Sequence, residues 1–210
     1  MPSRSRSNPL ALAVLSCLYE RPMHPYEVAQ TLRSRAKHES IRLNYGSLYS
    51  VVDALEGKGL IRARETVREG RRPERTVYEI TDAGEVELVD WLSELVSSPT
   101  KEYLNFEAAL SFIGVLPPDD AVMLLNQRAQ ALEVMLAQRR GVRRAAEEIG
   151  LPRLFLLEDE YMSHLLEAEL DWVRKLVKDI DTAALDGLDG WRAWAEGDRH
   201  AFGDWNADPS

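Results

Sequence analysis

The chain has 210 residues, 45% of them hydrophobic and 29% charged, which is the composition of an ordinary folded protein with one large domain or two small ones. It holds no apolar run near the length that spans a bilayer, and its first residues lack the apolar segment of a signal peptide, so we expect a cytoplasmic protein with no membrane partner. The single cysteine, Cys17, excludes an intrachain disulfide.

The net charge of −9 is unevenly distributed along the chain. Residues 1–80 hold 14 Lys and Arg against 9 Asp and Glu, a charge of +5, whereas the remaining residues hold 12 against 26, a charge of −14. A basic part followed by an acidic part predicts an N-terminal module that binds an acidic partner, carried on a second region.

The first predicted elements are a short arm and two helices. Residues 1–8 form a Ser- and Arg-rich arm, and a nearly wholly apolar helix is expected from Pro9 through LALAVLSCLYE. Cys17 lies inside that apolar run, which favours a buried thiol over a redox sensor. The segment RPMHP interrupts the helix, and a second helix is expected over residues 26–36.

A third helix is expected between Asn44, a good N-cap, and Leu60. Its helical spacing predicts a buried face made of Leu48, Val51, Val52 and Leu55. The opposite face carries only small or short side chains in its first turns, which would let the backbone enter the major groove of DNA. A surface helix that is merely poor in charge has the same pattern.

Two alternating segments follow, residues 61–67 and 76–80, which predict a β-hairpin. Its loop carries Arg68, Arg71, Arg72 and Arg75. Three helices followed by a hairpin with a basic tip are the order of a winged helix-turn-helix, in which the third helix enters the major groove and the wing follows the backbone. An arginine-rich solvated loop without a partner is the alternative.

Three motifs resemble those of PadR-type transcriptional regulators. They are HPYEV at 24–28, YGSLYSVVDALEGKGLI at 45–61 and RRPERTVYEITDAG at 71–84, in the family's order and at suitable separations. The resemblance implies a regulator that binds double-stranded DNA.

Within this hypothesis each candidate residue has an expected contact. We expect base-edge contacts from Gly46, Ser47 and Ser50, contacts shared between bases and phosphates from Tyr45 and Tyr49, backbone contacts from His24 and Tyr26, and phosphate or minor-groove contacts from Arg68, Arg71, Arg72 and Arg75.

The rest of the chain predicts helices. Thr81 or Asp82 caps a linking helix over 83–97 that completes a DNA-binding domain, residues 1–97 with the wing at 61–80. A helical domain then spans 98–181, with a short helix at 107–115 and long helices to about residue 148 and over 154–180. The expected fold class is mainly α with a small β-hairpin wing and a C-terminal antiparallel helical dimerisation domain.

The last long helix has two apolar stripes. One stripe would pack on its partner helix and the other on a second copy of the chain, as the resemblance to two-fold dimers also implies. The residues expected at the dimer interface are Tyr161, Leu165, Trp172 and Leu176. Packing of both stripes within one chain is the alternative.

Tryptophans and other aromatic residues raise two further hypotheses. Residues 182–210 are Gly- and Asp-rich and are expected to form an acidic, solvated tail, although Trp191, Trp194 and Trp205 would also suit docking onto the body or a partner. Relatives that resemble this chain release DNA when a phenolic or other apolar effector binds. The possible pocket residues are Trp91, Tyr103, Phe106, Tyr161 and Trp172, which would otherwise be plain core.

No enzyme motif with convincing spacing is present, so we expect neither a catalytic activity nor a cofactor. His164 with Glu160 and Glu167 has helical spacing for a metal, but a solvated helix face is favoured. The sequence therefore predicts a homodimeric repressor at a near-palindromic operator. A transcriptional activator of the same fold and a winged-helix protein-interaction module are the alternatives.

Overall fold

The computed structural model describes residues 8–37, 40–41, 43–67, 75–198 and 200–201. The chain divides into two compact units, residues 1–101 and 102–210, and each is described by itself. The first unit ends a few residues beyond the predicted linking helix.

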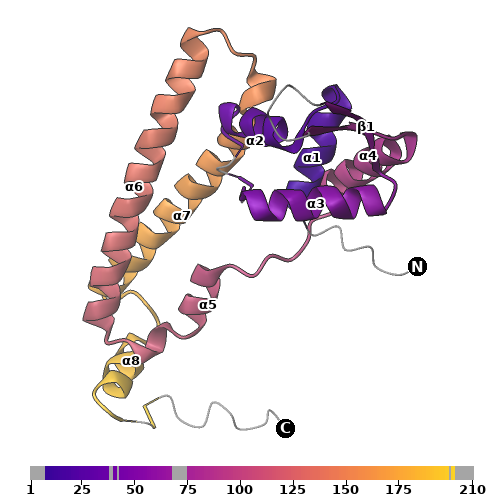
Figure 1. The fold of residues 1–210 in the computed structure, drawn as a ribbon. Helices are drawn as coiled ribbons and strands as arrows, with labels where there is room; N and C mark the ends of the chain where they lie inside the picture. The colour runs from indigo at the N-terminus through magenta and orange to yellow at the C-terminus, as the bar shows by residue number, and fades with distance from the viewer. Residues whose placement is uncertain (1–7, 38–39, 42, 68–74, 199, 202–210) are drawn as a thin grey trace. The chain divides into compact units, whose positions relative to one another are not determined.

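The first unit has the fold class that the sequence predicts, a helical bundle with one hairpin (Figure 1). Its elements are α1 (Pro9–Glu20), α2 (Pro25–Ser34), α3 (Tyr45–Gly57), β1 (Ile61–Val67), β2 (Arg75–Ile80) and α4 (Asp82–Ser97). Leu15, Val28, Leu48 and Ile61 contribute fully buried side chains from four of these elements to one core. Cys17 is also buried in α1, and this burial raises the pKa of its thiol to about 11.

The hairpin is tied to the helices at its base. β1 and β2 are antiparallel, with Ile61 opposite Ile80 and an irregularity between Ala63 and Glu65. Met23, in the turn before α2, exchanges two backbone hydrogen bonds of 3.0 Å with Tyr78 of β2. The wing therefore has a fixed position relative to the helix that precedes the α2–α3 pair.

α4 buries less of its apolar side than the sequence predicts. Leu88 and Trp91 are buried, but Leu92 and Leu95 are 42% and 48% exposed. The expectation of a broad buried face was wrong because, within this unit, only the strip of α4 that faces α1 is packed.

The second unit is built on a pair of long helices. Its elements are α5 (Asn105–Ser111), η1 (Ile113–Val115), α6 (Pro118–Glu148), η2 (Arg153–Leu156), α7 (Leu157–Asp181) and α8 (Leu188–Ala195). α6 and α7 form a hairpin whose connecting turn lies at one end, while α5 and α8 lie at the other (Figure 1).

One apolar stripe of α7 is buried against α6 and the other is open. Leu166, Leu170 and Val173 are at most 7% exposed, whereas Tyr161 is 63%, Leu165 43% and Trp172 46% exposed. α7 thus has one packed face and one apolar face without cover in this chain.

The region after α7 is not the solvated tail that its composition predicts, as far as the structure describes it. Leu188 and Trp191 of α8 are buried in the core of the second unit. The Trp191 Nε1–H donates a 2.8 Å hydrogen bond to the Leu116 carbonyl, which follows η1. Burial of one indole and satisfaction of its single donor outweigh the polar character of the surrounding sequence. Trp205 lies outside the described residues.

Candidate nucleic-acid interface

The front of α3 is an exposed surface of small side chains beginning at a firm N-cap. The Asn44 side chain accepts a 2.9 Å hydrogen bond from the Ser47 backbone N–H, which satisfies one of the free donors of the first turn. Gly46, Ser47 and Ser50 are exposed. The Ser50 hydroxyl donates back to the Gly46 carbonyl at 3.1 Å, so its oxygen remains an acceptor toward a ligand.

An open groove of about 620 Å³ runs along this front. Its lining residues come from α3, its cap and the cap of α1: Asn8, Asn44, Gly46, Ser47, Ser50, Val51 and Ala54. A Cβ added at Gly46 would meet only the Asn44 side-chain oxygen, at an ordinary 3.5 Å. Gly46 is thus small without being sterically required, which suits a surface that another molecule approaches closely.

An aromatic and cationic cluster stands beside the start of α3. The rings of Tyr26 and Tyr45 stack with centroids 6.2 Å apart and an interplanar angle of 11°. The Arg33 guanidinium lies 4.7 Å from the centre of the Tyr45 ring and donates a 2.5 Å hydrogen bond to its hydroxyl. Sequence reasoning identified both tyrosines and missed Arg33, because residues 12 apart on different helices share no local pattern.

His24 has a structural part in this region. It is the N-cap of α2, where its Nδ1 accepts a 3.1 Å hydrogen bond from the Tyr26 backbone N–H. The Glu27 carboxylate completes the capping box by accepting from the His24 backbone N–H at 2.9 Å. His24 therefore fixes the start of α2 and the position of Tyr26, which is 44% exposed.

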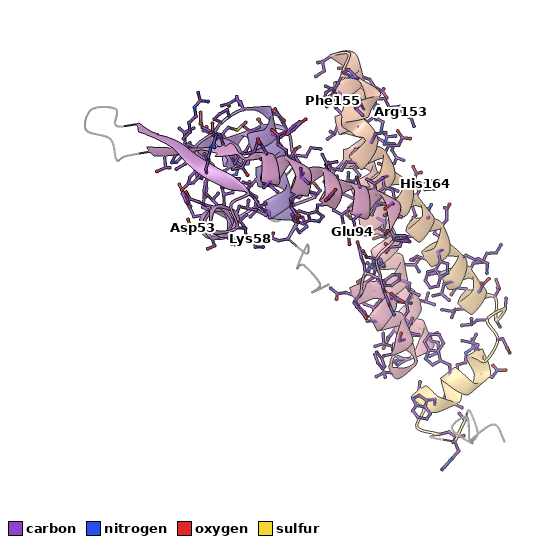
Figure 2. The ribbon with its side chains drawn as sticks, turned by 90° about the vertical axis from the view of Figure 1, so that its right-hand side faces the viewer. Asp53, Lys58, Glu94, Arg153, Phe155 and His164 are labelled. Carbon is purple, nitrogen blue, oxygen red and sulfur yellow. The ribbon has the colours of Figure 1, made fainter. Side chains whose placement is uncertain are left out.

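The far half of α3 is acidic. Asp53 is exposed there (Figure 2), and Glu56 follows in the next turn. Burial raises the pKa of the Tyr78 hydroxyl, and the negative charges of Glu56 and Asp53 raise it further. Carboxylates repel phosphates, so only the first turns of α3 suit contact with a nucleic acid.

The wing can be described only in its strands. Arg62 donates to Glu79 across the hairpin at 2.7 Å, and Arg64 lies 3.8 Å from the same carboxylate. The predicted contacts Arg68, Arg71 and Arg72 lie outside the described residues, as does the side chain of Arg75, whose backbone is in β2.

The five residues of the suggested effector pocket are distributed over both units. In the second unit, Phe106 and Trp172 make an edge contact at 6.1 Å, and the Arg128 guanidinium lies 3.6 Å from the centre of the Phe106 ring. Tyr103 is 86% exposed. Trp91 belongs to the first unit, where it is buried and its Nε1–H has no hydrogen-bond partner.

Other surfaces of the second unit carry little chemistry. A shallow groove of about 390 Å³ is lined by Arg143, Leu157, Glu160, Tyr161, Ser163, His164 and Glu167. Among the described residues, no three His, Cys, Asp or Glu side chains are placed to hold a metal ion. None of the helices in the described ranges is both long and apolar enough to cross a membrane.

Three helices, an exposed third helix with a small front and a hairpin joined to the turn before α2 define the first unit as a winged helix-turn-helix. Residues 14–90 match the family described as "Transcriptional regulator PadR-like family". The chain therefore carries a PadR-like domain. It belongs among transcriptional regulators and not among enzymes.

Similar proteins agree with this assignment. The "Negative transcriptional regulator PadR" of Bacillus subtilis (strain 168) is 26% identical over 138 residues, which cover 63% of this chain and 71% of that protein. The structure of Bacillus subtilis PadR with operator DNA has a TM-score of 0.65 at 19% identity, covering 81% of this chain and 98% of that one. Its structure with p-coumaric acid has a TM-score of 0.67 at 19% identity, covering 82% and 98%. At these identities the likeness to the solved structures establishes the fold.

Proposed function

We propose that this protein is a sequence-specific, homodimeric transcriptional repressor that binds double-stranded operator DNA. The observation that carries the proposal is the front of α3, where small exposed side chains begin at the Asn44 cap and an exposed cluster of Tyr26, Tyr45 and Arg33 stands beside them. α3 would enter the major groove with Gly46, Ser47 and Ser50 at the base edges. Tyr45, Tyr49 and Tyr26 would contact bases or phosphates at its margin.

The wing arginines would supply sequence-independent affinity. Arg68, Arg71, Arg72 and Arg75 are near in sequence, and each phosphate that they neutralise would release counterions. The negative regulation named for the Bacillus subtilis relative and the operator DNA in its structure support this reading.

The experiment is selection of bound DNA from a random pool, followed by fluorescence anisotropy at several salt concentrations. We expect a near-palindromic consensus with half-sites about one helical turn apart. The Arg71→Ala/Arg72→Ala variant should bind all sequences more weakly and lower the salt slope by roughly one unit per lost contact, whereas Ser47→Ala should change the base preference. Arg192→Gln, a charge change in the second unit, is the control. Recovery of no enriched sequence at low salt would contradict the proposal.

Dimerisation would occur through the uncovered face of α7. Tyr161, Leu165 and Trp172 are exposed apolar or aromatic residues on it, and Leu176 is half-buried. An open apolar stripe of this length on a folded helix favours a protein partner, and two DNA-binding domains related by a two-fold axis suit a palindromic site. Light scattering of the purified protein measures the stoichiometry.

A small aromatic effector would regulate binding. The p-coumaric acid bound to Bacillus subtilis PadR supports this, together with the aromatic residues Trp91, Tyr103, Phe106, Tyr161 and Trp172 of this chain. Fluorescence titration of the parent and Trp172→Phe with phenolic acids would test whether Trp172 reports on such a ligand. A promoter–reporter assay separates repression from activation.

A further inference from the structure

The α6–α7 hairpin exposes apolar residues at both of its ends. At the connecting turn, Ile149, Leu154 and Phe155 are 78%, 72% and 63% exposed; these residues are called the hairpin tip. Figure 2 shows Phe155 and Arg153 at this end of the unit. Exposed apolar clusters of this kind mark interaction surfaces.

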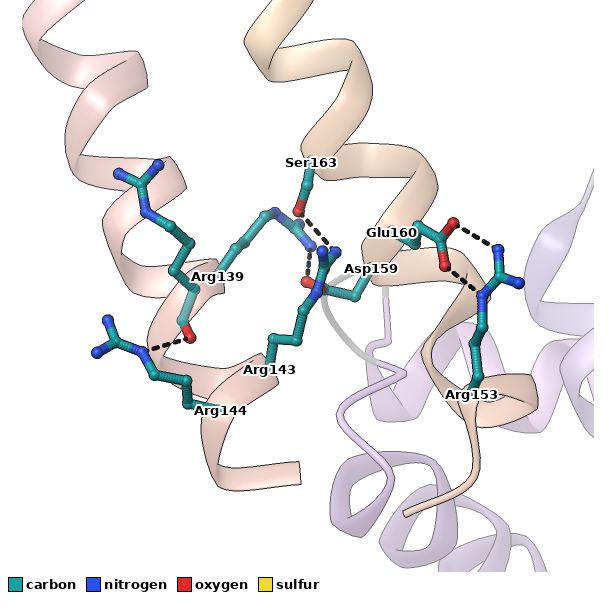
Figure 3. A network of polar contacts seen from close by, with 8 residues as sticks. Arg139, Arg143, Arg144, Arg153, Asp159, Glu160 and Ser163 are labelled. Atoms are coloured by element: carbon teal, nitrogen blue, oxygen red, sulfur yellow. Dashed lines mark hydrogen bonds and ion pairs between the residues drawn. The ribbon is translucent and has the colours of Figure 1, made fainter. Parts of the chain in front are cut away.

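Ion pairs hold the tip in a fixed conformation (Figure 3). The Asp159 carboxylate accepts hydrogen bonds from Arg139 at 2.8 Å and Arg143 at 3.0 Å, which joins the end of α6 to the start of α7. Arg153 donates two hydrogen bonds to Glu160, at 2.8 and 3.0 Å. The apolar side chains are thus displayed on a braced turn, and binding would cost little conformational entropy.

The opposite end has a complementary apolar surface on α5 and η1. Leu104, Phe112 and Val115 are 59%, 72% and 77% exposed; these residues are called the α5 patch. α5 has only seven residues and none of them is buried. Isolated helices of that length are marginal in water, so a cover over this segment is expected to stabilise it.

The charges of the two ends are opposite. Residues 139–153 contain five arginines and two glutamates, whereas residues 102–120 contain four acidic residues and no Lys or Arg. The exposed acidic side chains near the α5 patch are Glu102, Glu107, Asp119 and Asp120. Electrostatic complementarity therefore pairs the tip of one copy with the α5 end of another and disfavours pairing of like ends.

α7 alone specifies the same orientation. Residues 157–171 hold six acidic residues and no Lys or Arg, while the following residues to 181 include Arg174, Lys175 and Lys178. The exposed stripe is also self-complementary: Leu165 opposite Trp172 and Tyr161 opposite Leu176 share one midpoint, beside the small exposed Ala168. Two such helices pack antiparallel about that point.

The antiparallel register brings the two apolar ends together. Phe106 of α5 contacts Trp172 of α7, so α5 flanks the exposed stripe near its C-terminal half. A second α7 that runs antiparallel along the stripe carries its own N-terminal end, and with it the hairpin tip, to that place. Because the interface is two-fold, the same contact forms twice.

We propose that the hairpin tip of each copy docks on the α5 patch of a second copy, and that this reciprocal contact clamps both ends of the dimer. The inference rests on the proposed homodimer and adds its orientation and a second contact region. The patch directly follows the connection from α4, so the clamp also fixes the chain segment at which each DNA-binding unit is attached.

Cysteine cross-linking of the full chain tests the contact. Phe155→Cys and Val115→Cys are made separately, one with a longer tag, mixed to allow subunit exchange and oxidised with copper–phenanthroline. The native Cys17 is buried, with a pKa raised to about 11, and stays silent at neutral pH. We expect the mixture to give at least fivefold more disulfide-linked dimer than either variant alone. Val134→Cys, which is also exposed on α6, should not link to Val115→Cys.

The outcomes separate the clamp from the dimer. Light scattering that shows a dimer, with Phe155→Cys linking to itself or with no mixed product, overturns the clamp and leaves the dimer standing. A monomeric parent overturns both. A second measurement does not depend on oxidation: Phe155→Ser should raise the dimer dissociation constant at least fivefold, whereas Val134→Ser should leave it unchanged.

Discussion

Gly84 shows how one residue determines the junction between the hairpin and α4. Its backbone N–H donates to the Thr81 hydroxyl at 3.1 Å, and that hydroxyl donates to the Gly59 carbonyl at 2.7 Å. A Cβ on Gly84 would stand 2.0 Å from the Leu60 carbonyl oxygen and 2.7 Å from a side-chain carbon of Ile80. The sequence predicts the Thr81 cap from composition, but the need for glycine arises from a backbone contact that no local pattern encodes.

Replacing Gly84 by alanine is therefore expected to destabilise the first unit. The backbone oxygen of Leu60 cannot yield without distorting the base of the wing, so we expect Gly84→Ala to lower the free energy of unfolding by about 2 kcal/mol or more. Urea denaturation followed by circular dichroism measures the change.

Gly57→Ala is the matched control. A Cβ at Gly57 would meet nothing within 4 Å, and the residue is helical, so alanine should be neutral or stabilising by up to about 1 kcal/mol. Equal effects of the two substitutions would show that the close approach at Gly84 is unimportant.

At the level of helices, the small front of α3 is completed by a side chain from α2. Arg33 reaches the Tyr45 ring and hydroxyl, and Tyr45 stacks on Tyr26, so the first turns of both helices form one exposed aromatic and cationic surface. Arg35, two residues further on, is instead paired with Glu20 of α1 through hydrogen bonds of 2.5 and 2.8 Å. The two arginines have the same charge and different surroundings.

This difference yields a matched pair of variants for the proposed DNA interface. Arg33→Ala should weaken DNA binding about tenfold, or about 1.4 kcal/mol, because a phosphate contact and the support of Tyr45 are both lost. Arg35→Ala should change the affinity less than threefold, since its guanidinium is engaged by Glu20. Tyr45→Phe, which keeps the ring, should lie between them. Anisotropy titrations at one fixed salt concentration give the comparison, and equal losses for both arginines would reduce Arg33 to a general charge effect.

Helices with strong periodicity could be predicted from the sequence, and one without it could not. The spacing along α7 correctly separates the buried stripe of Leu166, Leu170 and Val173 from the exposed one. α8 lies in a Gly- and Asp-rich segment, and its burial depends on the Leu116 carbonyl, which is 75 residues away in the sequence. Only the tryptophan content of that segment pointed to a docked helix.

For the chain as a unit of function, the important property is that it has two separate cores. Leu15, Leu48 and Ile61 belong to the core of the first unit, and Leu125, Val173 and Trp191 to that of the second. Net charge follows the same division, because the basic residues of the first 80 positions are paired with an acidic remainder. A substitution in one core is thus expected to act on one folding unit.

Trp191 tests this independence because it joins α8 to the rest of the second unit. Trp191→Phe removes the donor to the Leu116 carbonyl and part of a buried ring, so we expect the second unit to lose about 1–3 kcal/mol of unfolding free energy. Calorimetry should show one thermal transition shifted downward and the other unchanged. Trp194→Phe, at a half-buried position three residues away, should have a smaller effect. If both transitions moved together, the two cores would be coupled more strongly than their separate packing implies, and losses of DNA affinity in second-unit variants could no longer be assigned to the proposed dimer alone.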